Sequence, residues 1–255
     1  MKGDIRLLKA CLNGQRSQAE FPAVPVTPDE LAADAAAAVA AGAEAIHLHA
    51  RGRDGAESVR AGDVGAAVAA VRVACPGTPV GVSTGLWITG GDAAARQAAV
   101  SQWADLPAGA RPDFASVNVS EDGWADVVRS LGVAGIATEA GVWSVTDVQV
   151  LARAVEGGAL AALPLRILIE VMGVPASSAP QVAEDILRAL DDSPLGGLPR
   201  LLHGEGEGCW PLVTQAAREG LLTRIGLEDT TAGPDGQPVS GNAELVRLAL
   251  AVLRG

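Results

Sequence analysis

Two histidines near the start of the chain are spaced for binding a metal ion. His47 and His49 follow an apolar run and are separated by one residue. In a β-strand, side chains two residues apart point to the same face, about 6–7 Å apart along the chain. Two imidazoles at that separation suit one zinc ion, and Glu228 could complete a His-His-Glu set with one position open for substrate. The alternative is two structural histidines held by hydrogen bonds at a strand end.

The proposed third ligand lies in a charged segment near the end of the chain. Arg224 and Asp229 flank Glu228 there. Strand alternation would put Arg224 and Glu228 on one face, and Asp229 could reach back to the arginine. A guanidinium–carboxylate pair beside a metal could orient a base or bind a substrate carboxylate. A structural ion pair at the rim of a barrel is the alternative interpretation.

Strand-like and helix-like segments alternate along the whole sequence. Strands are expected at residues 5–12, 45–50, 79–83, 114–118, 135–139, 165–170, 200–203 and 222–227. The first helix is expected between the capping residue Thr27 and the terminator Gly42. Later helices are expected at 62–74, 92–103, 124–131, 144–155, 179–190, 209–219 and 242–253. Eight such units predict an α/β fold, a single-domain (β/α)8 TIM barrel over residues 1–255, rather than an open doubly wound sheet.

Every predicted strand ends in polar side chains. Active sites of such barrels form at the carboxyl ends of the strands, so these side chains are candidate site residues. They are Asn13, His47, His49, Ser83, Thr84, Ser116, Asn118, Glu139, Glu170, His203, Glu228 and Asp229. The hydroxyl and amide groups among them could bind a carboxylate or an oxyanion.

His203 opens a glycine-spaced loop after the seventh predicted strand. It could be a third metal ligand, an acid–base group or a structural histidine. Glu205 and Glu207 in this loop would repel a phosphate. We therefore expect a flexible lid rather than a phosphate cradle. Trp87 and Trp143 follow predicted strands and could line the same pocket.

Composition excludes several classes of function. The net charge is −11 and no lysine or arginine cluster occurs, which argues against a nucleic-acid partner. The three cysteines form no Cys-x-x-Cys pair, which is typical of a reducing compartment. No apolar run reaches 18 residues, and the first residues are too polar for a secretion signal. We expect a cytoplasmic protein without a membrane partner.

Several segments together resemble the β-keto acid cleavage enzyme family. The resemblance runs along nearly the whole chain, and its His-x-His and Arg-x-Gly-x-Glu-Asp segments are the most specific. The matching segments are residues 27–30, 41–43, 47–51, 82–85, 112–118 and 224–229, followed by Asn242 before the last helix.

The resemblance implies a zinc-dependent barrel enzyme that converts a β-keto acid and acetyl-CoA into acetoacetate and a new acyl-CoA. It further implies a homo-oligomer, a dimer or a tetramer. Matching motifs imply the following roles: His47, His49 and Glu228 bind zinc, Arg224 and Asp229 form the catalytic pair, Ser83 and Ser116 position the substrate carboxylate, and Glu139 contributes to substrate recognition.

Three departures from the family pattern bear on the substrate. The first predicted strand is followed by Asn13-Gly14-Gln15-Arg16, where the family commonly has Thr-Gly-Ala-Glu. We expect Asn13 and Arg16 to contact substrate, and Arg16 to favour a neutral or anionic tail over an amine. The loop at 203–208 lacks the family's Gly-x-Gly-Arg pattern, which weakens the case for CoA. The sequence also stops soon after the last helix, as expected for a short, divergent subgroup.

Three alternatives stay open beside this prediction. The first is a CoA-independent, metal-dependent lyase or hydrolase on the same scaffold. The second is a hydrolase of the amidohydrolase type, but that type carries its His-x-His on the first strand and needs further histidines on later strands. The third is a ligand-binding barrel without catalysis, against which the combination of His47, His49, Arg224, Glu228 and Asp229 speaks.

Overall fold

Eight parallel strands, each paired with its neighbours in chain order, close into a barrel in the computed structural model, which describes residues 8–160 and 163–255. Strand β8 pairs with β1 and closes the ring. The strands are β1 (Leu8–Cys11), β2 (Ala45–Leu48), β3 (Val80–Ser83), β4 (Phe114–Asn118), β5 (Ala137–Val142), β6 (Arg166–Val171), β7 (Arg200–Gly204) and β8 (Leu222–Ile225). The predicted TIM barrel is confirmed. Residues 5–7 of the first predicted strand lie outside the described residues.

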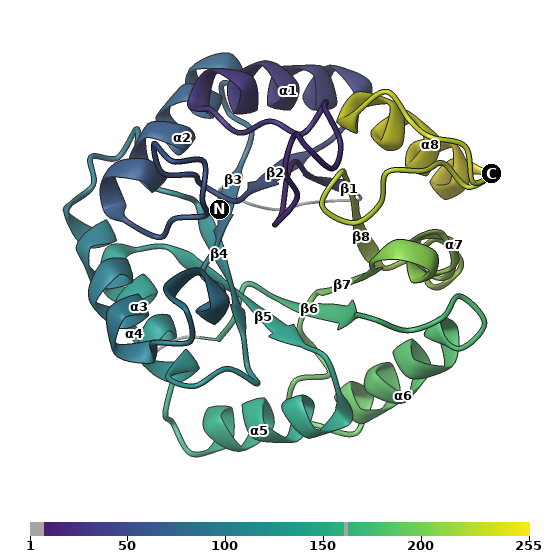
Figure 1. Cartoon of the computed structure of the whole chain (residues 1–255). Helices are drawn as coiled ribbons and strands as arrows, with labels where there is room; N and C mark the ends of the chain where they lie inside the picture. Colours follow the sequence, from purple (N-terminus) through teal and green to yellow (C-terminus); the bar gives the residue numbers. More distant parts are fainter. Residues whose placement is uncertain (1–7, 161–162) are drawn as a thin grey trace.

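In the described part of the chain, eight α-helices alternate with the strands and surround the barrel (Figure 1). They are α1 (Pro28–Ala41), α2 (Ala61–Ala74), α3 (Ala93–Ser101), α4 (Trp124–Ala134), α5 (Val145–Glu156), α6 (Ala179–Asp191), α7 (Cys209–Glu219) and α8 (Asn242–Arg254). Helix α1 begins as predicted, because Thr27 and Glu30 form a reciprocal capping box, and it ends at Gly42 in the left-handed conformation.

Two strands differ from prediction in a way that affects the site. Strand β5 begins and ends later than expected, because Gly135 terminates α4 with a φ of 69°. Glu139 therefore lies inside the strand and not at its end. Strand β8 ends at Ile225, because the chain then turns and the Asp229 amide donates to the Gly226 carbonyl at 2.9 Å.

The interior of the barrel below the site contains a buried ion cluster. Lys9 Nζ lies 2.8 and 2.6 Å from the two oxygens of Glu139, and Arg166 Nε lies 2.9 Å from Oε1. Both cations also approach the ring of Phe114, at 5.4 and 5.3 Å from its centroid. Burial opposes the charged carboxylate, but Lys9 and Arg166 outweigh it and lower the pKa of Glu139. These contacts occupy the interior of the barrel below the carboxyl ends of the strands.

None of the described helices is both long enough and apolar enough to cross a lipid bilayer. The cysteines Cys11, Cys75 and Cys209 are all buried free thiols.

Candidate metal centre and active-site cavity

A cavity of about 660 Å³ opens at the carboxyl ends of the strands. Much of its wall was predicted from the sequence. The predicted residues that line it are Arg16, His47, His49, Ser83, Ser116, Asn118, Glu170, Arg224, Glu228 and Asp229. Trp87 and Trp143 line it as well, as expected for residues that follow β3 and β5.

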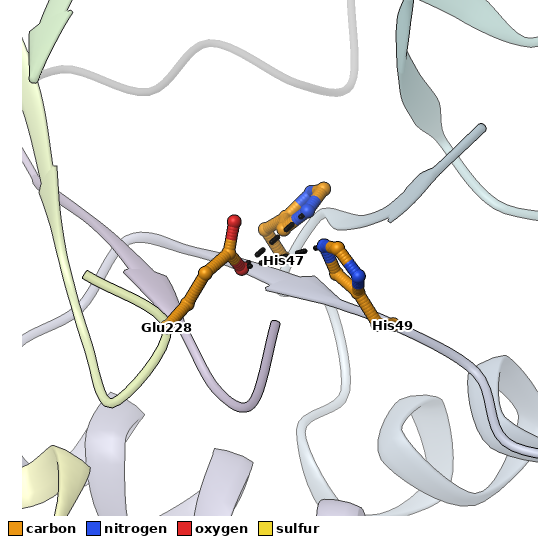
Figure 2. A group of neighbouring side chains, drawn as sticks. All are labelled: His47, His49 and Glu228. Atoms are coloured by element: carbon orange, nitrogen blue, oxygen red, sulfur yellow. Dashed lines mark ion pairs between the residues drawn. The ribbon is translucent and has the colours of Figure 1, made fainter. Parts of the chain in front are cut away.

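His47, His49 and Glu228 converge on one point at the wall of this cavity. One potential ligand atom from each lies within 4.8 Å of the others, and no other such group of three occurs in the described part of the chain. Figure 2 shows both imidazoles turned toward the same carboxylate oxygen: Glu228 Oε2 lies 3.7 Å from His47 Nε2 and 3.6 Å from His49 Nε2. The imidazole centroids are 5.2 Å apart.

These three residues fit a metal ion. Glu228 Oε2 is buried yet accepts no hydrogen bond in the described structure, which is costly for a carboxylate oxygen unless a cation binds it. Burial holds the pKa of His47 well below its ordinary value, which keeps this imidazole neutral as a ligand must be. Two imidazoles and a carboxylate form a donor set typical of catalytic zinc.

His49 and Glu228 each stabilise the charge of the other. Burial opposes a protonated His49, but Glu228 and Glu57 outweigh it and raise the pKa of His49 to about 9. Burial likewise opposes a charged Glu228, but Arg224 and the two histidines hold the pKa of Glu228 well below its usual value. A metal ion held by these residues would require a neutral His49, so its binding would release the proton of that imidazole.

Close packing of backbone places Glu228 in the cavity. The turn after β8 passes so near β1 that a Cβ on Gly226 would lie 1.8 Å from the Cys11 carbonyl oxygen, and only glycine fits. The Asn242 side chain accepts from the Leu227 amide at 2.7 Å and donates to the Leu12 carbonyl at 2.8 Å. This explains why the Arg-x-Gly-x-Glu-Asp segment and Asn242 occur together.

The loop after β1 supports Glu228 from the other side. Gly14 has a φ of 55°, and a Cβ there would lie 2.5 Å from Glu228 Cγ. Arg51 Nη2 donates to the carbonyls of Gly14 and Arg16 at 2.5 and 3.0 Å and holds the loop in place. Arg51, which belongs to the His-x-His segment, thus connects that segment to the loop that packs on the third ligand.

Arg224 and Asp229 form the predicted pair, although not by strand alternation. Arg224 Nη2 lies 2.8 Å from both Glu228 Oε1 and Asp229 Oδ1, and the turn after β8 brings all three groups together. Burial opposes the charge on Arg224, but Asp229 and Glu228 outweigh it and hold its pKa well above its usual value. The second oxygen of Asp229 is buried and has no hydrogen-bond partner in the described structure. It is the atom of this pair that remains able to accept a proton.

A polar wall from β3 and β4 faces the cavity beside the ligand residues. Ser83 and Ser116 are register partners on these neighbouring strands. Asn118 donates to Glu121 Oε1 at 3.0 Å, and the buried Arg96 forms an ion pair with Glu121. Two hydroxyls side by side suit a substrate carboxylate, and Arg96 and Glu121 fix the amide next to them.

Four of the predicted site residues do not line the cavity: Asn13, Thr84, Glu139 and His203. Asn13 is buried, and its side chain accepts from the His49 amide at 2.8 Å and donates to the His49 carbonyl at 2.9 Å. Thr84 donates to the Ser116 carbonyl at 2.6 Å. Glu139 is fully buried, with Lys9 on both of its oxygens. Asn13 and Thr84 therefore orient the backbone beside a site residue, and Glu139 belongs to the ion cluster below.

Sequence reasoning missed Glu57. Glu57 Oε1 lies 2.5 Å from His49 Nδ1, and its other oxygen accepts from Trp87 Nε1 at 3.0 Å. The Trp87 ring also stacks on His49, with centroids 6.3 Å apart. A carboxylate on the second nitrogen of a ligating histidine fixes the tautomer and the ring orientation. The sequence offers no signal for this role beyond an acidic residue in the loop after the His-x-His segment.

We expect Glu57→Gln to weaken zinc binding by about 10–100-fold, because the oriented carboxylate partner of His49 is lost. Competition with a chromogenic chelator measures this directly. Glu207→Gln is the matched control, because Glu207 is an exposed glutamate that contacts none of His47, His49 and Glu228. It should leave the zinc affinity unchanged. Equal zinc affinities for Glu57→Gln and wild type would contradict the role of Glu57.

His203 is not part of the metal group. It is buried between two carboxylates, with Nδ1 3.6 Å from Asp229 Oδ1 and Nε2 3.4 Å from Glu170 Oε2. The expectation of a flexible lid in the following loop stays a prediction. This loop forms a short 3₁₀ helix at Gly206–Gly208, and the Gly206 amide donates to the Asp229 carbonyl at 2.8 Å.

Solved structures with a similar architecture include ObcA in binary complex with oxaloacetate, with 19% identity and a TM-score of 0.72. A ternary complex of ObcA with a C4-CoA adduct and oxalate has 19% identity and a TM-score of 0.71. Both matches cover 92% of this chain and 64% of ObcA, so this chain spans less than two thirds of ObcA. Type I 3-dehydroquinate dehydratase from Clostridium difficile, with covalently modified comenic acid, has 13% identity and a TM-score of 0.63 over 99% of this chain and 94% of the dehydratase.

At these identities the likeness to solved structures establishes the barrel fold. The family follows from the sequence as a whole, because residues 7–255 match the model of one family. The resemblance found in the separate segments is thereby confirmed: the chain belongs to the beta-keto acid cleavage enzyme family.

Proposed function

We propose that this protein cleaves a β-keto acid in a zinc-dependent exchange with acetyl-CoA, giving acetoacetate and a new acyl-CoA. The observation that carries the proposal is the meeting of a His47–His49–Glu228 set and an Arg224–Asp229 pair at one cavity of a family member. ObcA, which has the same fold, has been solved in complexes with oxaloacetate and with a C4-CoA adduct, which supports a keto acid and a CoA derivative as ligands.

In this proposal His47, His49 and Glu228 hold the zinc ion. A bound zinc ion supplies Lewis acidity, which polarises a carbonyl group and makes the adjacent carbon more acidic. The hydroxyls of Ser83 and Ser116 bind the substrate carboxylate and orient the chain of the keto acid in the cavity.

The base of the proposed reaction is Asp229. Arg224 holds its Oδ1 at 2.8 Å, which leaves the unpartnered Oδ2 to accept a proton from the substrate. The guanidinium stays charged throughout and stabilises negative charge that develops nearby. In this proposal different side chains therefore bind the substrate carboxylate, hold the metal ion and accept the proton.

One observation favours a second candidate, a CoA-independent lyase or hydrolase at the same site. Glu205 lines the cavity in the loop after β7. A carboxylate at that position repels the phosphates of CoA and does not repel a small neutral acyl acceptor such as water.

Metal analysis combined with a product assay separates these functions. Purified protein should contain about one zinc per chain, as a single site of this type requires. It should also form acyl-CoA from acetyl-CoA and at least one member of a panel of β-keto acids. Zinc without acyl-CoA, but with release of a cleaved acid, would favour the CoA-independent reaction. Protein that binds no zinc would contradict both.

We expect Arg16 to select the charge of the substrate tail. Arg16 lines the cavity, and its Nε donates to the Leu227 carbonyl at 2.6 Å. Arg16→Glu should shift the ratio of kcat/KM values toward cationic keto acids by about tenfold, because the sign of a cavity charge is reversed.

Arg16→Gln is the matched control. It removes the positive charge without adding a negative one, and it also removes the hydrogen bond from Nε to the Leu227 carbonyl. Because Leu227 precedes Glu228, the kcat/KM of this variant shows how much the loss of that hydrogen bond alone disturbs the site. An unchanged substrate profile in Arg16→Glu would show that Arg16 does not face the substrate tail.

A further inference from the structure

His203 on β7 is a buried histidine that belongs to neither the metal group nor the cavity wall. Its side chain is 1% exposed, and neither ring nitrogen has a hydrogen bond within the described structure. Burying a polar group is costly unless it finds a partner. The groups that its two nitrogens face therefore decide what this histidine does.

Both nitrogens of His203 face carboxylates. Nε2 lies 3.4 Å from Glu170 Oε2, and Nδ1 lies 3.6 Å from Asp229 Oδ1. Glu170 and His203 are register partners on β6 and β7, which places their side chains next to each other. The turn after β8 brings Asp229 to the other side of the ring. The imidazole thus forms ion pairs with two acidic side chains that both line the cavity.

Two carboxylates around one imidazole favour its doubly protonated form. A neutral imidazole has one N–H, so one of the two carboxylates would face the lone pair of a ring nitrogen. An imidazolium donates from both nitrogens and places a positive charge between two negative ones. Both distances are longer than a hydrogen bond, as is common for catalytic contacts before a ligand binds.

The neighbouring charged groups agree with a cation at this position. Arg224 donates to both Glu228 and Asp229. One guanidinium does not balance these two carboxylates together with Glu170. On α7, burial and the charge of Asp229 raise the pKa of the Cys209 thiol well above its usual value, so this thiol is neutral. A second cation, supplied by His203, therefore fits the local charge.

His203 and Arg224 contact the same oxygen of Asp229. Arg224 Nη2 donates to Oδ1 at 2.8 Å, and His203 Nδ1 faces that oxygen at 3.6 Å. Oδ2 is buried and has no hydrogen bond within the described structure. Rotation of the carboxylate would exchange its two oxygens, and two cations on Oδ1 oppose that exchange. They keep Oδ2 as the oxygen that is free to accept a proton.

We propose that His203 is a protonated positioning residue that bridges Glu170 and Asp229 and fixes the orientation of Asp229. In this role His203 neither contacts the substrate nor transfers a proton. The inference rests on the proposed function in taking Asp229 to be the base. The bridge itself is a property of the protein that can be measured without turnover.

The charge of His203 is accessible to NMR because the chain has three histidines. Protein labelled with ¹⁵N in its histidine rings gives one pair of ring signals for each of them. The pair that is lost in His203→Gln should have the shifts of an imidazolium near neutral pH. Glu170→Gln and Asp229→Asn should each lower the pH at which this ring loses its proton by about one unit or more, because each removes a neighbouring negative charge.

Kinetics tests the effect on Asp229. His203→Gln should lower kcat by about tenfold or more and change the KM for the keto acid by less than about twofold, because the base is misoriented but the substrate contacts remain. His203→Asn is the matched variant. The asparagine amide nitrogen takes the place of Nδ1 and faces Asp229, whereas the glutamine nitrogen takes the place of Nε2 and faces Glu170. His203→Asn should therefore keep a higher kcat than His203→Gln.

Three results would overturn the proposal: a neutral His203 ring near neutral pH, a titration that neither Glu170→Gln nor Asp229→Asn changes, or equal kcat values for wild type and both His203 variants. If neither His203 variant folds, the ring signals of wild type and Glu170→Gln decide. A ring that loses its proton at lower pH in Glu170→Gln supports the bridge, and the absence of such a ring overturns it. An imidazolium that responds to both carboxylate variants, in a protein that turns over no β-keto acid, would support the bridge and contradict the proposed function.

Discussion

Replacing His49 with alanine is expected to abolish stoichiometric zinc binding and to lower kcat/KM by about a thousandfold or more. Only His47 and Glu228 would remain of the three-residue group. Two donors do not hold zinc in a site that needs three protein ligands and an open position. Elemental analysis after dialysis against a weak chelator measures the metal, and the same sample is assayed for turnover.

The contacts of His49 define the control for this variant. The imidazole also contacts Glu57 and Trp87, so folding should be checked by circular dichroism alongside Glu207→Gln. A folded His49→Ala protein that still carried one zinc per chain would refute the ligand assignment. A folded, zinc-free protein with wild-type turnover would instead refute the role of the metal in catalysis.

The second large effect is expected at Asp229. Asp229→Asn should lower kcat by about 10²–10⁴-fold, because the amide keeps the shape of the carboxylate but no longer accepts a proton. Zinc content should stay at the wild-type level, since Glu228 and both histidines are unchanged. Steady-state kinetics with a saturating keto acid gives kcat, and elemental analysis of the same preparation gives the zinc.

Arg224→Lys provides the comparison for Asp229→Asn. Lysine keeps a positive charge beside Asp229. It lacks the guanidinium, whose Nη2 donates to both Glu228 and Asp229. It should therefore show a smaller loss in kcat than Asp229→Asn. A kcat for Asp229→Asn within a factor of two of wild type would exclude Asp229 as the base.

The architecture could be predicted because the local signals of the sequence agree with one another. Short buried strands, the Thr27–Glu30 capping box and polar side chains at the strand ends all indicate the same closed barrel. The spacing of His47 and His49 predicted their convergence, although β2 ends at Leu48 and the Asn13 side chain orients the backbone of His49. That Glu228 joins them depends on barrel closure, because β8 meets β1 only when the ring of strands is complete.

Other parts of the site depend on contacts that no local pattern specifies. Asn13 is polar and follows a strand, as a ligand-binding residue would, but its side chain is satisfied by the backbone of His49. Glu139 seemed to end a strand, but the left-handed Gly135 delays β5 and places the carboxylate below the cavity against Lys9. Glu57 reaches His49 from a loop, and loop conformation is not set by hydrophobic periodicity.

The position of the ligands along the chain governs when the metal can be acquired. His47 and His49 belong to the second strand, whereas Glu228 follows the eighth and packs against Gly14 and Cys11 at the closing seam. A ribosome adding about 5–20 residues per second needs on the order of ten seconds or more to progress from the histidines to the glutamate. During that time the nascent chain offers two donors and no closed barrel. If these residues hold a metal as proposed, the site would be complete only after the barrel closes, and the ion would then connect β2 to the turn after β8.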